Sequence, residues 1–251
     1  MSYLDQLFSL EGKFAVVTGA SRGLGNAIAD ALLRAGATVL LVSANQERLQ
    51  AATAAFQAEG LRAAMHCCDL ADKAQIAALL AAIGKDPGRV DILVNAAGMT
   101  EGHPLLDYPA DVWERTLQVN LTAAFLLAQG VAALMVEQQS GSIINITSIN
   151  AERGFPGNPA YVAAKGALKQ LSKALAVDLA PYGIRVNNIG PGYFHTDWRI
   201  QAPLPVPESL PLILCRAVPY MVVSSFNVRL LSCLLYIATL LHNSKSLGFL
   251  F

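Results

Sequence analysis

The chain has 251 residues, no formal net charge at neutral pH, 54% apolar residues and 14% charged residues. This length fits one α/β domain with a sizeable core, and the balanced charge gives no sign of a nucleic-acid surface or a polybasic membrane arm. Residues 1–14 lack the pattern of a secretory signal, and the four cysteines lack zinc-like spacing, so we expect a cytoplasmic protein with reduced thiols and no metal.

Up to residue 192, short apolar runs alternate with segments of helical periodicity. The predicted strands are residues 13–18, 38–43, 63–70, 90–98, 142–148 and 184–192. The predicted helices are residues 24–35, 46–58, 72–83, 109–138 and 159–182. Apolar strands that alternate with helices predict a parallel sheet covered on both faces.

The composition changes after residue 200. Five of the twelve prolines lie between Pro203 and Pro219, and residues 201–251 contain few charges and one glycine, Gly248. The uncharged run 230–241 is too short to span a bilayer, so we do not expect a membrane partner. Membrane association through this Leu-rich segment is kept as an alternative.

A glycine-rich loop, TGASRGLG, joins the first predicted strand to the first predicted helix at residues 18–25. Gly19, Gly23 and Gly25 allow a tight turn and a close approach of the backbone to a phosphate, while the helix N-terminus attracts the negative charge. The loop therefore predicts a dinucleotide site.

The end of the second predicted strand indicates which dinucleotide binds. An NAD site usually has an acidic residue there to hold the ribose 2′-OH, but this chain has Ser43, Ala44 and Asn45. Arg22, inside the glycine loop, could contact a 2′-phosphate. We therefore favour NADP as the cofactor, with NAD as the alternative.

Seven motifs in order along residues 8–197 together resemble the short-chain dehydrogenase/reductase family. The chain is most similar to the members that act on sugar acids such as gluconate or on 3-oxoacyl groups. The motifs are TGASRGLG (18–25), CDL (68–70), NAAG (95–98), Asn120, Ser148, YVAAK (161–165) and PGYFHT (191–196).

The resemblance implies an α/β fold made of a single Rossmann-fold domain over residues 1–197. The implied doubly wound parallel sheet has the strand order 3-2-1-4-5-6. Residues 198–251 lack the glycines and acids of the family's substrate lid and seventh strand, so we expect an aberrant segment there, produced by a shift of reading frame or an aberrant exon. The family also implies a homodimer through the long helices, and a tetramer is less expected.

The resemblance also implies the residues that bind the dinucleotide and carry out catalysis. The implied cofactor residues are Gly19, Ser21, Arg22, Gly23, Leu24, Gly25, Asp69, Leu70, Asn95, Ala96, Ala97, Gly98, Tyr161, Lys165, Pro191, Gly192 and Thr196. The implied catalytic residues are Asn120, Ser148, Tyr161 and Lys165.

The chemistry expected of these residues is hydride transfer coupled to proton transfer, between a nicotinamide and a secondary alcohol or ketone such as a sugar acid. A phenol has a pKa of about 10, so Tyr161 acts as a base only if its phenolate is stabilised. Lys165 lies one helical turn further on and supplies a positive charge on the same face. Ser148 would orient the substrate oxygen, and Asn120 resembles the family residue that holds a proton-relay water.

Other interpretations of the same residues remain. Each catalytic candidate, taken singly, could be an ordinary buried or solvated side chain, and the altered C-terminal segment leaves open a defective family member that binds dinucleotide without catalysis. Between Ser148 and Tyr161, we expect Glu152, Arg153 and Asn158 to be candidate substrate contacts.

Overall fold

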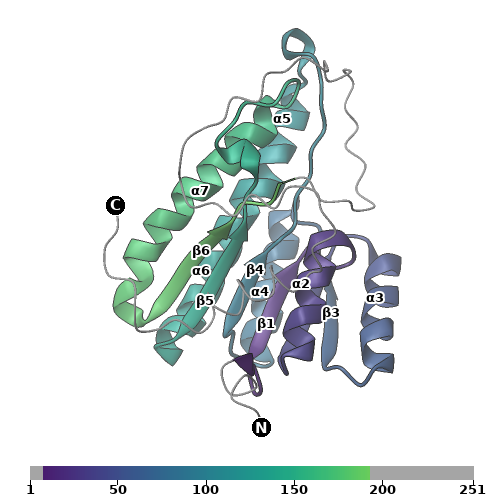
Figure 1. The fold of residues 1–251 in the computed structure, drawn as a ribbon, viewed down its shortest axis with the longest axis vertical. Coiled ribbons are helices and arrows are strands. Elements are labelled where there is room, and N and C mark those ends of the chain that lie inside the picture. The colour runs from purple at the N-terminus through teal and green to yellow at the C-terminus, as the bar shows by residue number, and fades with distance from the viewer. Residues whose placement is uncertain (1–7, 193–251) are drawn as a thin grey trace.

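Six parallel strands form one sheet in the order β3-β2-β1-β4-β5-β6 in the computed structural model, which describes residues 8–192 (Figure 1). The predicted strand order is confirmed. The seventh strand, the substrate lid, Thr196 and the segment 198–251 lie outside the described residues. The strands are β1 (Phe14–Thr18), β2 (Thr38–Ser43), β3 (Ala63–Cys67), β4 (Ile92–Asn95), β5 (Gly141–Ile146) and β6 (Ile184–Ile189).

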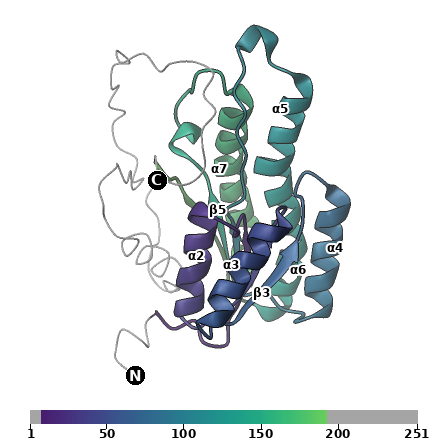
Figure 2. The ribbon, with the colours of Figure 1, turned by 90° about the vertical axis from the view of Figure 1, so that its right-hand side faces the viewer.

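Helices connect the strands and cover both faces of the sheet. Figure 2 shows α2 and α3 on one side and α4 and α6 on the other. The α-helices are α2 (Gly23–Arg34), α3 (Gln46–Ala58), α4 (Lys73–Lys85), α5 (Ala110–Leu117), α6 (Ala123–Gln138) and α7 (Pro159–Leu179). Short 3₁₀ turns are η1 (Leu105–Asp107), η3 (Ile149–Ala151) and η4 (Ala180–Tyr182).

Each face of the sheet has its own apolar core. Leu32 of α2 and Leu49 of α3 pack with Val17 and Leu41 of the strands on one face. On the other face, Leu79 and Leu127 pack against strand residues that include Leu93. Strands buried on both faces need apolar side chains at nearly every position, which explains the continuous apolar runs in the sequence.

The strand order reverses between β1 and β4, whose neighbours β2 and β5 lie on opposite sides of this pair. Crossover connections leave in opposite directions at this point, and a crevice opens outside the carboxyl ends of the strands. The glycine-rich loop follows β1, and the NAAG motif begins at the end of β4. The topology therefore brings two sequence motifs more than 70 residues apart to one crevice.

The predicted helix at 109–138 is interrupted by a wider turn. A π-helical segment, η2 (Gln118–Thr122), separates α5 from α6. Segments of this kind occur within α-helices at functional sites, and η2 contains Asn120. The run Ala110–Gln138 is also long and apolar enough to cross a membrane, a property shared by core helices of soluble proteins, and its α6 part packs against α4 in this fold.

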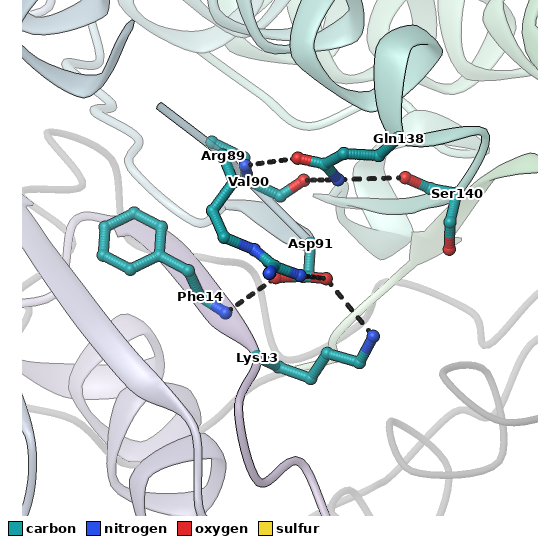
Figure 3. A network of polar contacts seen from close by, with 7 residues as sticks. All are labelled: Lys13, Phe14, Arg89, Val90, Asp91, Gln138 and Ser140. Atoms are coloured by element: carbon teal, nitrogen blue, oxygen red, sulfur yellow. Dashed lines mark hydrogen bonds and ion pairs between the residues drawn. The ribbon is translucent and has the colours of Figure 1, made fainter. Parts of the chain in front are cut away.

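A buried carboxylate ties the amino-terminal edge of the sheet together (Figure 3). Asp91, 8% exposed, accepts hydrogen bonds from the Phe14 N–H at 2.9 Å and from Arg89 Nη2 at 2.8 Å, and it pairs with Lys13 Nζ at 3.3 Å. Burial raises the pKa of the Asp91 carboxyl, but the bonds from Arg89, Phe14 and Lys13 outweigh burial and hold the pKa below its usual value. The Gln138 side chain continues the network by bonding the backbone N–H and C=O of Val90.

Replacement of Asp91 by alanine should destabilise the fold. The change takes the carboxylate partner away from Lys13 and Arg89 and leaves the Phe14 N–H without its acceptor. We therefore expect the free energy of unfolding at neutral pH to fall by about 2–4 kcal/mol. Urea unfolding of the wild-type chain and Asp91→Ala measures this difference.

The same comparison has a defined pH dependence. Because the pKa of Asp91 is lowered by folding, its stabilisation is complete above the pKa of an unfolded aspartate, about 3.9, and is lost as the pH falls through the folded value. The difference between the two proteins should therefore shrink in acid. Asp30→Ala, which removes an exposed partner of Arg34, is the control and should change stability little. Equal losses in Asp91→Ala and Asp30→Ala would contradict the assignment.

Candidate active site

The glycine-rich loop makes two backbone contacts that only glycine permits. A Cβ atom on Gly25 would lie 2.4 Å from the carbonyl oxygen of Gly19, and a Cβ atom on Gly19 would lie 2.8 Å from Cα of Ala97. Gly19 also has a positive φ of 66°. The loop is thus held tightly between β1 and the residues after β4, and no Cβ atom projects from these two positions toward the crevice.

The start of α2 faces this crevice as a site for negative charge. Arg22 is the N-cap residue of α2, but its side chain makes no capping hydrogen bond to the helix. The first N–H groups of a helix have no intrahelical partner, and together with the helix dipole they favour an anion. This arrangement suits the pyrophosphate of a dinucleotide.

Thr18, the last residue of β1, connects β1 to the residues after β4 at the floor of the crevice. Its hydroxyl oxygen accepts hydrogen bonds from the N–H groups of Ala96 and Ala97, both at 3.1 Å. Behind the floor, the buried Asn95 donates from Nδ2 to Asn145 Oδ1 at 2.8 Å. These bonds fix the ends of β1, β4 and β5 relative to one another.

Most of the predicted site residues line one cleft of about 410 Å³ at the carboxyl ends of the strands. All predicted cofactor residues line it except two. Asn95 is 4% exposed and lies behind the cleft, and Thr196 lies outside the described residues. Among the catalytic candidates, Ser148, Tyr161 and Lys165 line the cleft, whereas Asn120 does not.

Asn120 instead packs against the wall of the cleft from the π-helical segment. It is 1% exposed, accepts a hydrogen bond from the Met99 N–H at 3.2 Å and donates to the carbonyl oxygens of Met99 and Thr116. A Cβ atom on Gly98 would lie 2.9 Å from Asn120 Oδ1, so Asn120 and the backbone after β4 meet only because residue 98 is glycine. The water-relay role of Asn120 stays a prediction.

Lys165 carries its ammonium into the interior. The residue is 4% exposed, and Nζ donates to the carbonyl oxygen of Ile146 at 2.8 Å. Within residues 8–192 it makes no ion pair with a carboxylate. Burial lowers the pKa of Lys165 to about 8, because the charged form loses its hydration.

Tyr161 is largely buried, and its environment affects the pKa of the phenol. Burial raises the pKa of the Tyr161 phenol, and a hydrogen bond with Ser148 offsets only part of that rise. Lys165 Nζ lies 5.7 Å from the centroid of the Tyr161 ring. Burial is thus the main influence on the phenol pKa in this structure, and stabilisation of the phenolate by Lys165 stays a prediction.

None of the three expected substrate contacts lines the cleft. Glu152 pairs with Lys169, and Asn158 is buried and accepts a hydrogen bond from the Thr100 hydroxyl at 2.6 Å. Neither lines the cleft, nor does Arg153. Instead, Asn150 and Phe155 from the same segment line it, with Thr100 and Arg48. No motif marked these four positions, although the segment between Ser148 and Tyr161 was the correct place to look for two of them.

The part of the chain that the structure covers contains no group of three or more His, Cys, Asp or Glu side chains able to hold a metal ion. The groups in the cleft that can take part in proton transfer include the Ser148 hydroxyl, the Tyr161 phenol and the Lys165 ammonium.

Comparisons with known proteins agree with this geometry. The chain is 42% identical over 197 residues to gluconate 5-dehydrogenase of Gluconobacter oxydans, covering 78% of this chain and 77% of the relative. It is 37% identical over 216 residues to 5-keto-D-gluconate 5-reductase of Escherichia coli, covering 86% and 84% of the two chains.

A solved structure of gluconate 5-dehydrogenase from Burkholderia cenocepacia, in complex with NADP and tartrate, is also similar. It superposes with a TM-score of 0.72 at 37% identity, covering 76% of this chain and 75% of that one. The family model for short chain dehydrogenases matches residues 13–204, which includes the glycine-rich loop and the Tyr161–Lys165 pair. The chain therefore belongs to the short chain dehydrogenase family.

Proposed function

We propose that the chain is an NADP-dependent oxidoreductase that interconverts a sugar-acid ketone, of the 5-keto-D-gluconate type, and the corresponding secondary alcohol. The observation that carries this proposal is the single cleft in which Ser148, Tyr161 and Lys165 lie beyond the glycine-rich loop. The similarity to gluconate 5-dehydrogenase and 5-keto-D-gluconate 5-reductase supports the substrate class.

The dinucleotide fits the described residues. The approach of Gly19 to Ala97 and the uncapped start of α2 suit a pyrophosphate. The end of β2 carries Ser43, Ala44 and Asn45, without a carboxylate that would repel a 2′-phosphate, and Ser43 Oγ lies 2.9 Å from Ser21 Oγ. The Burkholderia relative contains NADP, which supports the same choice here.

In the proposed mechanism, Tyr161 is the general acid for ketone reduction. Its raised pKa keeps the phenol protonated at neutral pH, ready to donate to the developing alkoxide. Ser148, hydrogen-bonded with Tyr161, orients the substrate oxygen, and the nicotinamide, when bound, supplies or accepts the hydride. Lys165 is largely protonated below pH 8, and its charge offsets that of the phenolate left after proton donation.

Asn120 acts in this proposal from behind the cleft wall. Its hydrogen bonds with the Met99 backbone hold the loop that follows β4 in place beside Lys165. A water held at Asn120 would connect Lys165 with solvent so that the proton donated by Tyr161 can be replaced.

We further propose a soluble cytoplasmic enzyme that forms a homodimer through the long helices. Trp113 of α5 and Phe125 of α6 expose 38% and 36% of their surfaces, which is apolar area that a second copy could bury.

The proposed catalytic residues all lie within residues 8–192, and no observation there favours a membrane-bound or catalytically defective protein over an active enzyme.

The full-length chain should oxidise NADPH when 5-keto-D-gluconate is added. Loss of NADPH absorbance measures this reaction, with NADH as the cofactor control and a 3-oxoacyl thioester as the substrate control. Higher kcat/KM with NADPH and the sugar acid is expected. Preference for NADH would overturn the cofactor assignment, and preference for the thioester would overturn the substrate class.

Tyr161→Phe tests the general acid directly. Loss of the phenol hydroxyl should lower kcat by about 10²–10⁴-fold, because a positioned proton donor contributes a factor of this size. The affinity for NADP⁺ should stay nearly unchanged. Tyr182→Phe is the matched control, since Tyr182 is 40% exposed and does not line the cleft. Near-normal turnover in Tyr161→Phe would contradict the mechanism.

A further inference from the structure

Two arginines line the part of the cleft that lies beside the glycine-rich loop. Arg22, before α2, and Arg48, in α3, both line the main cleft together with Ser21 and Ser43. Arg22, Arg48 and Ser21 also line an adjoining groove, whose α3 wall is formed by alanines and Phe56. Sequence motifs singled out Arg22 alone, because Arg48 lies within an ordinary helical run.

The charged side chains that line the groove beside Arg48 are positive. Among the described residues, no acidic side chain lines the adjoining groove, and Asp69, just after β3, is the one acidic residue that lines the main cleft. Arg34, Arg62 and Arg89 each pair with a carboxylate, whereas Arg48 forms no ion pair with any other residue between positions 8 and 192.

The position of Arg48 in its helix is also electrostatically unfavourable. Arg48 is the third residue of α3, and its N–H donates to the N-cap side chain of Asn45 at 2.9 Å. A cation in the first helical turn is disfavoured by the helix dipole, and the like charge of Arg22 lines the same groove. A bound dianion would relieve both effects.

We propose that Arg48 is a second determinant of NADP recognition, which holds the 2′-phosphate together with Arg22. This inference rests on the proposed NADP-dependent function. The Ser21 and Ser43 hydroxyls, 2.9 Å apart, lie at the corner that the adenosine ribose must occupy if its phosphates face the start of α2. From there, a 2′-phosphate points toward the groove lined by Arg22 and Arg48, and each guanidinium can donate charge-assisted hydrogen bonds to it.

Equilibrium binding of NADP⁺ and NAD⁺ to the full chain, measured by calorimetry, tests the proposal without relying on turnover. Arg48→Ala should weaken NADP⁺ binding about 10-fold, the size expected for one hydrogen bond to a charged group, and leave NAD⁺ binding unchanged. Arg48→Lys should recover part of the loss. Adenosine 2′,5′-bisphosphate should respond as NADP⁺ does, and adenosine 5′-monophosphate as NAD⁺ does.

The variant should fold normally, since alanine in the first turn removes an unfavourable cation and has high helix propensity. Thermal unfolding checks this. Lys85→Ala is the matched control, because it also removes one positive charge but lies exposed at the far end of α4 and lines neither the cleft nor the groove. It should change neither affinity.

The outcomes separate this inference from the proposed function. If the wild-type chain prefers NADP⁺ and Arg48→Ala keeps that preference, the role of Arg48 is overturned while the cofactor assignment stands. An equal loss for NADP⁺ and NAD⁺ also overturns it, because the residue would then serve the fold or the shared part of the dinucleotide. If the wild-type chain does not prefer NADP⁺, the cofactor assignment and this inference both fail, and the Tyr161 prediction is unaffected.

Discussion

The site depends on a buried ammonium that has no carboxylate partner among residues 8–192. Lys165 is 4% exposed, and the hydrogen bond of its Nζ to the Ile146 carbonyl is the polar contact that secures its position. Burying such a charge is costly, and the cost is visible in the lowering of its pKa. Perturbed lysines of this kind are concentrated at functional sites, where the charge is held for a reaction rather than for stability.

The surrounding chain makes room for this charge. A Cβ atom on Gly98 would lie 2.9 Å from Asn120 Oδ1 and 3.6 Å from Lys165 Nζ, so a side chain there would clash with Asn120 and touch Lys165. The π-helical segment Gln118–Thr122 carries Asn120 to this point, and parallel pairing of β4 with β5 brings the loop after β4 beside Ile146. Helix α7 then carries Tyr161 and Lys165 on one face, one turn apart. Local geometry and sheet topology therefore act together to place the reactive groups.

Sequence patterns predicted much of this arrangement. Helix α3 begins and ends where its periodicity predicts, and the strand order is the one that the family resemblance implied. The glycine spacing predicted a tight turn, and Gly19 and Gly25 make close backbone contacts there; the approach of a phosphate stays a prediction.

Other features could not be predicted because they depend on tertiary contacts. The π-helical turn is accompanied by hydrogen bonds between Asn120 and the backbone of Met99, 21 residues away, and QVNLT alone gives no such signal. The direction of the Tyr161 pKa shift depends on how deeply the phenol is buried, which a four-residue spacing does not reveal. Arg48 lines the same groove as Arg22, 26 residues earlier in the chain, which only the tertiary fold brings about.

The most direct test of the account is the pKa of Lys165 itself, measured by NMR titration of its side-chain nitrogen in the intact protein. The expected value is about 8, because the ammonium is buried and loses its hydration. An ordinary value near 10.5 would mean that the ammonium is solvated or paired, and the proposed site would not have the electrostatics described here.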